Sequence, residues 1–366
     1  MMLYRKLLKG ENMQIDFHHT VTYVCARMAG FEHDEADIIA YSAQYVDDAT
    51  NAGIVKFDNG ALYSRISSAH TTFDIKHHMN RLENHQVWVP FHFLPGNLGK
   101  TVRYTHKGGF HQKLVCKPDS PISRNMLDMT IKDYKKAYSL HRLGIAMHVY
   151  ADTFAHQGFA GIIHPVNEVY DLQLENEELG WDDIVKYKAI SKRFPMGHGA
   201  ALECPDKPYL KWSYKNGIKG SKRVVRDNTE IFITAVQAMV GQLMLFRTTL
   251  KMEVPDYNEA DENKIRENFI TFIDQDGEKR HHKWLYSIKN GDFSFGAVNL
   301  EYIPKGTGSW KYQAIGQENK IDIFGEEFEY TEEFLSSNWK LFHDALQAHR
   351  FDVIHDILPR YGICVA

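Results

Sequence analysis

The chain has 366 residues, of which 43% are hydrophobic and 25% charged, a composition that is ordinary for a globular protein of one large domain or two smaller ones. Its formal net charge of −4 argues against a broad nucleic-acid-binding surface, and no run of roughly 20 apolar residues predicts a transmembrane segment. The four cysteines lie far apart, without the paired spacing of a zinc ribbon, so we expect reduced thiols rather than a cysteine-based metal site.

Hydrophobic periodicity predicts a mainly α-helical chain. Residues 1–12 form an N-terminal extension that lacks the apolar core of a signal peptide, which favours a cytoplasmic protein. No linker interrupts the rest, so residues 13–366 are predicted to be a single domain, with a metal-site core at about 13–250 and a C-terminal embellishment at about 275–366. Helices are predicted over 14–31, 34–50, 124–157 (as one or two helices), 224–252, 260–274 and 326–358.

The remaining segments predict loops and a few short strands. Asp58-Asn59-Gly60 is a turn signal that indicates a hairpin or an irregular loop within 54–70. The apolar segment 87–95 contains Pro90 and Pro95, which favour a packed, extended loop over a regular helix. Residues 96–122 are predicted to be surface loop, and 281–325 to be mixed, with β-prone pieces. A glycine- and proline-containing passage follows the helix at 124–157 and extends to about 208.

The predicted helix at 124–157 carries the strongest functional signal. His148, Asp152 and His156 occupy positions i, i+4 and i+8, which lie along one helix face. The surrounding residues are apolar on nearly every side, so an uncompensated carboxylate there would cost several kcal/mol, on the order expected for a buried charge. The simpler interpretation is a buried His–Asp ion pair without a ligand. The interpretation we favour is a metal site, in which imidazole and carboxylate are the ligands.

Candidate partners for this helix precede it in the chain. His18 and His19 lie in the first predicted helix, and His70 follows the hairpin segment. Asp47 and Asp48 end the second predicted helix, where two negative charges oppose the helix dipole unless a cation lies nearby.

Two further candidate sets follow the helix. His198 lies between two glycines and precedes Asp206 by eight residues, while His164 and Glu168 are four residues apart. We favour His198 with Asp206, because the flanking glycines indicate a backbone held close to another group.

In this order, the candidate residues resemble the pattern of the zinc-dependent phospholipase C and single-strand nuclease superfamily. That pattern consists of an early histidine, an aspartate at the end of a helix, a single histidine, an HxxxD helix, a nearby histidine, and a final histidine with a carboxylate. More closely, the stretches 16–30, 43–48, 88–96, 148–161 and 197–206 resemble an uncharacterised bacterial domain family that is distantly similar to that superfamily.

The resemblance implies a multi-helix bundle with long loops and a few short β-strands, and a cleft that holds two or three zinc ions, with manganese or iron as alternatives. The implied metal ligands are His18, His19, Asp47, Asp48, His70, His148, Asp152, His156, His198 and Asp206. In the secreted enzymes a terminal amine and a tryptophan carbonyl help to bind one zinc; this chain has no tryptophan there, and Asp16 could substitute.

The implied function is hydrolysis of a phosphate ester or phosphodiester by a zinc-activated water, with a small phosphate-containing molecule or a lipid headgroup as ligand. Asp47 or Asp48 would bridge metals or orient the attacking hydroxide, and Arg65, Lys100 or Arg103 could neutralise a phosphate. The alternative is a non-catalytic, metal-stabilised helical binding protein. Nothing in the sequence indicates the oligomeric state.

A second enzyme class, the HD-type phosphohydrolases, needs an adjacent His–Asp pair together with a further histidine and aspartate. The candidate pairs are His33-Asp34, His343-Asp344 and His355-Asp356. All three fall in charged, amphipathic segments without supporting context, so this reading is the weaker one.

Overall fold

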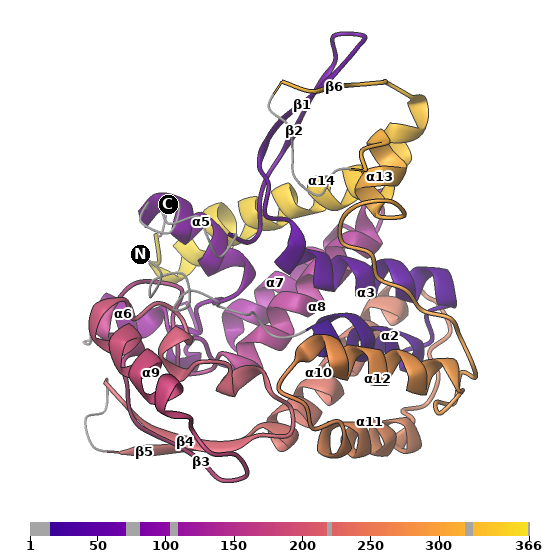
Figure 1. The fold of residues 1–366 in the computed structure, drawn as a ribbon. Helices are drawn as coiled ribbons and strands as arrows, with labels where there is room; N and C mark the ends of the chain where they lie inside the picture. Colours follow the sequence, from indigo (N-terminus) through magenta and orange to yellow (C-terminus); the bar gives the residue numbers. More distant parts are fainter. Residues whose placement is uncertain (1–14, 71–80, 103–108, 218–221, 319–324, 365–366) are drawn as a thin grey trace.

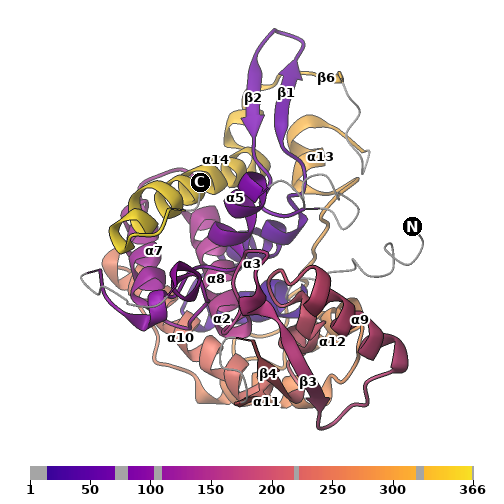
Figure 2. The same cartoon turned by 90° about the vertical axis from the view of Figure 1, so that its left-hand side faces the viewer.

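The structure, a computed structural model, describes residues 15–70, 81–102, 109–217, 222–318 and 325–364. Helices dominate the fold, and two small sheets lie at its periphery (Figures 1 and 2). The α-helices are α2 (Thr22–Met28), α3 (His33–Asp48), α5 (Arg81–Phe91), α6 (Phe110–Lys113), α7 (Pro121–Lys132), α8 (Ser139–Ala155), α9 (Trp181–Arg193), α10 (Asn228–Thr249), α11 (Glu259–Thr271), α12 (Gly277–Lys289), α13 (Trp310–Ile315) and α14 (Asn338–Phe351).

Shorter π- and 3-10 helical turns connect these elements. The π-helical turns are η1 (Asp16–Val21) and η7 (Asp352–Ile357). The 3-10 turns are η2 (Asn97–Gly99), η3 (Pro165–Asn167), η4 (Gly199–Ala201), η5 (Cys204–Asp206), η6 (Glu332–Ser336) and η8 (Leu358–Tyr361).

Each of the two sheets has three strands. In the first, β1 (Gly53–Phe57) pairs antiparallel with β2 (Leu62–Arg65) and parallel with the short β6 (Glu327–Phe328). The β1–β2 hairpin extends away from the helical body (Figure 1). In the second, β4 (Lys211–Asn216) lies between β3 (Val169–Leu174) and β5 (Arg223–Asp227), and both pairings are antiparallel. Neither sheet forms the centre of the molecule.

Helix α8 lies at the centre of the fold. Every residue from His141 to Ala155 is buried, as expected for a helix that is apolar on nearly all sides. Helices α3, α7, α10 and α14 pack around it (Figure 2). A polar side chain on this helix therefore meets protein groups on every side rather than solvent, which makes His148 and Asp152 costly to bury without ligand or partner.

Helices α3 and α8 approach each other closely at Gly144. A Cβ atom added there would lie 2.3 Å from the carbonyl oxygen of Ile39 and 2.6 Å from the Cβ of Ser42. Only glycine fits this contact, and the same two helices also bring Asp47 of α3 to 3.9 Å from His148 of α8.

We expect Gly144→Ala to destabilise the protein by about 1–3 kcal/mol, because the added methyl group overpacks a backbone contact that cannot yield. Gly241→Ala in α10 is the matched control: no atom lies within 4 Å of the added Cβ, and the change is expected to stabilise by about 0.5–1 kcal/mol. Thermal unfolding of both variants tests this, and equal or higher stability of Gly144→Ala than of the wild type would contradict it.

The mainly α-helical prediction is confirmed, and of the two alternatives left open for 124–157 the structure shows two helices, α7 and α8. The hairpin at Asp58-Asn59-Gly60 is confirmed as β1 and β2. Two predictions were wrong: residues 87–91 belong to helix α5 rather than to an extended loop, and residues 281–289 belong to helix α12 rather than to a mixed segment with β-prone pieces. Pro90 stands one residue from the end of α5, where its missing N–H removes a bond only in the last turn.

One helix, α10, is long and apolar enough to cross a membrane by length and composition alone. Half of its most apolar 18-residue stretch is buried inside the protein, and the core helices of globular proteins are often as long and as apolar. The described residues therefore contain no clear transmembrane segment.

Candidate metal centre

Three groups of histidine and aspartate side chains surround the C-terminal half of α8. In each group the potential ligand atoms lie within 4.8 Å of one another. The groups are Asp47, His92 and His148; His18, His148 and Asp152; and His156, His198 and Asp206. Because His148 belongs to two groups and His156 is one turn beyond Asp152, we treat the three as one candidate metal centre.

Several distant segments supply these side chains. The π-helical turn η1 supplies His18, the last turn of α3 supplies Asp47, and the segment after α5 supplies His92. The two residues of the third group that lie outside α8 come from the turns η4 and η5: His198 immediately precedes η4, and Asp206 ends η5. π-helical turns are rare and often occur at functional sites, which suits the position of His18.

The central group has the spacing of a metal site. His148 Nε2 lies 3.2 Å from His92 Nδ1, and both nitrogens lie 3.4 Å from Asp152 Oδ2. Asp47 Oδ1 lies 3.7 Å from the same nitrogen of His92 and 3.9 Å from that of His148. Four ligands at 2.0–2.1 Å around a tetrahedral ion would be about 3.3 Å apart, and these five distances of 3.2–3.9 Å are near that value.

Asp152 connects the groups. Its Oδ2 atom faces His92 and His148, and its Oδ1 atom lies 3.3 Å from His18 Nε2. Among the described residues, no group donates a well-aligned hydrogen bond to either oxygen, although the side chain is buried. Buried carboxylates nearly always have hydrogen-bond donors or a cation, so these two oxygens indicate two adjacent cation positions.

The third group offers three protein ligands. His156 Nε2 lies 3.5 Å from Asp206 Oδ1, and His198 Nε2 lies 3.6 Å from Asp206 Oδ2. As for Asp152, no well-aligned hydrogen bond from a described residue reaches either oxygen of Asp206. The side chain of His198 is 9% exposed, so this group is adjacent to solvent. Two histidines and one carboxylate are a ligand set that leaves a fourth coordination position open.

Backbone carbonyl groups fix the orientation of three of the histidines. His92 Nε2 donates to the carbonyl oxygen of Ser68 (2.9 Å), and His156 Nδ1 donates to that of His92 (2.8 Å). His198 Nδ1 donates to the carbonyl oxygen of Leu202 (3.0 Å). A neutral ring that donates from one nitrogen presents a lone pair at the other, and in all three rings that nitrogen faces a carboxylate. Two electron-rich groups facing each other are stable only with a proton or metal ion between them.

The pKa values of the histidines also indicate that protons and metal ions would compete for these nitrogens. Burial and the adjacent His18 ring lower the pKa of His148 to about 4, so its ring is neutral at pH 7 and suited to metal binding. Burial also acts to lower the pKa of His156, but the carboxylates of Asp152 and Asp206 outweigh it and raise the pKa to about 9. Without a metal, a proton on His156 would partly replace the missing cation, and metal binding would release it.

The candidate cation position beside His18 has the fewest protein ligands of the three. If His148 serves the central group, His18 and Asp152 remain as protein ligands there. Asp16, which we considered as a substitute, instead forms a buried ion pair with Arg280, with 2.7 Å between Oδ2 and Nε. His19 points elsewhere, and its Nδ1 lies 2.9 Å from His281 Nε2.

Other predicted site residues also lie outside the three groups. Asp48 Oδ2 accepts hydrogen bonds from Tyr302 (2.6 Å) and Gln44 (3.2 Å), so its carboxylate is directed away from Asp47. The ring of His70 lies edge-on to Trp88. His164 stacks on His111 with 3.7 Å between ring centroids, and Glu168 accepts a hydrogen bond from Tyr170.

The three His–Asp pairs of the HD-type reading also lie outside these groups. Arg103 falls outside the residues that the structure describes. Between the two downstream sets, the structure brings His198 and Asp206 into the centre rather than His164 and Glu168.

Sequence reasoning missed His92 and Arg226. His92 stands between two phenylalanines in a buried segment, and a histidine in such an apolar run needs a partner. Arg226 donates to the carbonyl oxygens of Phe154, Ala155 and Gln157 and so caps the C-terminus of α8 next to His156. No local sequence pattern indicates that cap, because strand β5 supplies the arginine.

The structure assigns His92 to the metal centre, whereas the order of ligands along the chain suggested His70. A pair of variants distinguishes these two assignments. We expect His92→Ala to lower the bound metal after dialysis against buffered zinc, because the central group loses a nitrogen ligand. His70→Ala, a change of the same kind outside the three groups, should leave the metal content unchanged. Elemental analysis of both variants measures this. Loss of metal from His70→Ala alone would contradict the structural assignment.

A family described as a family of unknown function (DUF6765) matches residues 13–357 of the chain. No curated protein and no solved structure matches it.

Proposed function

We propose that this chain, which belongs to the DUF6765 family, is a metal-dependent hydrolase of phosphate esters or phosphodiesters whose active site is the centre around α8. The observation that carries the proposal is the third group. His156, His198 and Asp206 provide three ligands and a solvent-facing edge next to the shared carboxylate of Asp152. Catalytic zinc sites typically have three protein ligands and an open position, whereas structural sites are closed by four.

Mixed imidazole and carboxylate ligands suit zinc best, with manganese or iron as alternatives. Two or three such ions, when bound, would lower the pKa of a water molecule and neutralise the oxygens of a phosphate. The protein residues supply the positioning. Asp152 holds three imidazoles in one arrangement, and Phe93 stacks on His156 with 4.7 Å between ring centroids, which limits its movement.

Asp47 takes the catalytic role that the sequence left open between Asp47 and Asp48. Its side chain is 9% exposed, equal to that of His198 and more than those of the other residues in the centre. It is therefore the carboxylate that an entering water or substrate would meet, where it could orient a nucleophile. Asp48 is already engaged by Tyr302 and Gln44.

The proposal extends to the fold type and the ligand. The candidate ligands follow the order His18, Asp47, His92, His148 with Asp152, His156, and His198 with Asp206. This order supports a bundle of the zinc-dependent phospholipase C type, with His92 as the single histidine. The ligand would be a phosphate-containing small molecule or a lipid headgroup.

A second candidate function is that of a metal-stabilised binding protein without catalysis. The observation that favours it is the burial of the central group, in which His92, His148 and Asp152 are each at most 1% exposed. Four ligands enclose that position, so it could be purely structural.

Hydrolysis of bis-p-nitrophenyl phosphate distinguishes the two functions. We expect zinc-dependent turnover that falls at least about 100-fold in His198→Ala, since removal of a metal ligand should exceed the 10–100-fold effect of outer-shell changes. His164→Ala is the control, because His164 lies outside the three groups, and it should retain turnover. Two or more bound metals with no turnover of this or any other phosphodiester would favour the binding protein.

A further inference from the structure

Four side chains make up the central group of the metal centre, and they divide into two pairs. His148 and Asp152 lie one turn apart on α8, so the helix itself fixes their spacing. Asp47 and His92 come from different elements, the last turn of α3 and the segment after α5, yet their facing atoms Oδ1 and Nδ1 lie 3.7 Å apart. The spacing of this second pair therefore depends on tertiary contacts.

Ser68, three residues after the end of β2, joins the two elements that carry this pair. Its Oγ donates to the carbonyl oxygen of Val46 (2.6 Å), and its backbone N–H donates to that of Ala49 (2.9 Å). Its own carbonyl oxygen accepts the hydrogen bond from His92 Nε2 (2.9 Å). One fully buried residue thus binds the backbone before and after Asp47 as well as the ring of His92.

The contacts to α3 supply hydrogen bonds that the helix cannot make for itself. The last four carbonyl groups of an α-helix have no intrahelical N–H partner. Val46 is among the last four residues of α3, and Ala49 is the residue that follows the helix. Because Ser68 donates to both carbonyl groups, it fixes the backbone at the point from which Asp47 faces the central group.

The contact to His92 determines which ring nitrogen carries the proton. Nε2 donates to Ser68, so the neutral ring presents the lone pair of Nδ1 to the other ligands of the central group. Outer-shell hydrogen bonds of this kind orient metal ligands and make them more basic, which strengthens metal binding.

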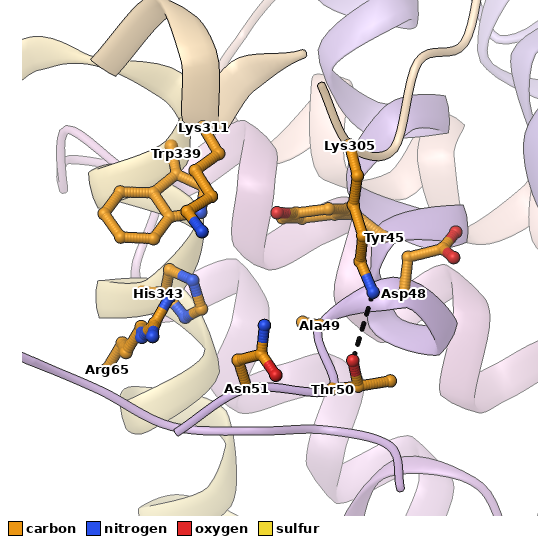
Figure 3. A pocket seen from close by; sticks show the side chains of 10 residues that line it. All are labelled: Tyr45, Asp48, Ala49, Thr50, Asn51, Arg65, Lys305, Lys311, Trp339 and His343. Carbon is orange, nitrogen blue, oxygen red and sulfur yellow. Dashed lines mark hydrogen bonds between the residues drawn. The ribbon is translucent and has the colours of Figure 1, made fainter. Parts of the chain in front are cut away.

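A further contact holds the same end of α3 from another direction. Lys305 Nζ donates to Thr50 Oγ1 (3.2 Å) at the wall of a small cavity that Asp48 and Thr50 also line (Figure 3). The cavity therefore lies on the side of the helix end that carries Asp48, whose carboxylate is directed away from Asp47. This contact restrains α3 alone, whereas Ser68 joins α3 to the ligand that follows α5.

We propose that Ser68 is a positioning residue of the metal centre, which sets the distance between Asp47 and His92 and so the metal affinity of the central group. The inference rests on the metal centre of the proposed function, but it does not require that centre to be catalytic.

Zinc affinity, measured by competition with a chromophoric chelator, tests this role. The full-length His198→Ala protein is the background, because its third group lacks a ligand and the affinity measured is then that of the central group. In this background, Ser68→Ala should weaken zinc binding about 10- to 100-fold, the range typical of outer-shell changes.

Two variants separate positioning from a general loss of stability. Ser123→Ala is the matched control, because Ser123 is also fully buried and its Oγ donates to a carbonyl oxygen, that of Ser120 (2.8 Å), but it lies on α7 outside the metal centre. It should keep the zinc affinity of the background even if it lowers the melting temperature as much as Ser68→Ala does. Ser68→Thr keeps the hydroxyl donor and should also keep the affinity.

A measurement on the wild-type protein does not depend on how any variant folds. Long-range proton–nitrogen NMR of the zinc-loaded protein should show His92 protonated at Nε2, and a proton at Nδ1 would overturn the proposal. An unchanged affinity in Ser68→Ala, or an equal loss in Ser123→Ala or Ser68→Thr, would also overturn it and leave the metal centre standing. A wild-type protein that binds no zinc, manganese or iron would overturn the metal centre and this inference together.

Discussion

Asp152→Asn should remove at least one metal ion per chain and lower phosphodiester hydrolysis at least about 100-fold, more than any other single change in the centre. The amide has nearly the same shape as the carboxylate, but it lacks the negative charge that His18, His92 and His148 face at 3.3–3.4 Å. Because Asp152 is shared between groups, one substitution weakens two adjacent positions. Elemental analysis and turnover of bis-p-nitrophenyl phosphate measure the two effects.

Asp128→Asn is the control for this experiment. Asp128 lies exposed on α7, so the same chemical change there should alter neither metal content nor turnover. If Asp152→Asn kept the wild-type metal content and turnover, the carboxylate could not be the connecting ligand of the centre.

Removal of metal should lower the melting temperature by at least about 5 °C. A ligand that binds only the folded state at 1,000 times its Kd contributes about 4 kcal/mol of stability. The physical reason lies in the oxygens of Asp152 and Asp206, which are buried without well-aligned hydrogen-bond donors among the described residues. Without a cation these oxygens face only imidazole nitrogens. The metal-free folded state is therefore less stable than the metal-bound folded state.

Thermal unfolding before and after dialysis against a chelator measures this effect, and addition of zinc, manganese or iron(II) one at a time shows which ion restores the loss. Asp152→Asn provides the internal control, since a protein that already lacks metal should respond less to the chelator. An unchanged melting temperature in wild-type protein of proven metal content would show that the ions do not stabilise the fold.

The sequence was most informative where local pattern decides structure. The apolar frame of residues 143–155 predicted a buried helix, and α8 is buried from His141 to Ala155. The i, i+4, i+8 spacing of His148, Asp152 and His156 placed these side chains on one face, and the structure brings all three into the groups around that face. Such arguments need only helical geometry, which is the same in every context.

The sequence was least informative where tertiary packing selects among similar residues. Order along the chain suggested His70, whereas the structure brings in His92, which follows a helix that contains Pro90. Likewise, only packing separates Asp47 from Asp48: neighbouring positions on a helix point about 100° apart, so one faces His148 and the other Tyr302.

The central claim is that the histidines and aspartates around α8 bind metal ions. Anomalous X-ray diffraction from crystals of the metal-loaded protein, recorded on both sides of the absorption edge of the bound metal, tests it most directly. We predict one peak among Asp47, His92, His148 and Asp152 and a second among His156, His198 and Asp206, each within about 2.0–2.2 Å of its ligand atoms. Anomalous peaks found only elsewhere in the protein, or none in protein that retains bound metal, would contradict the claim.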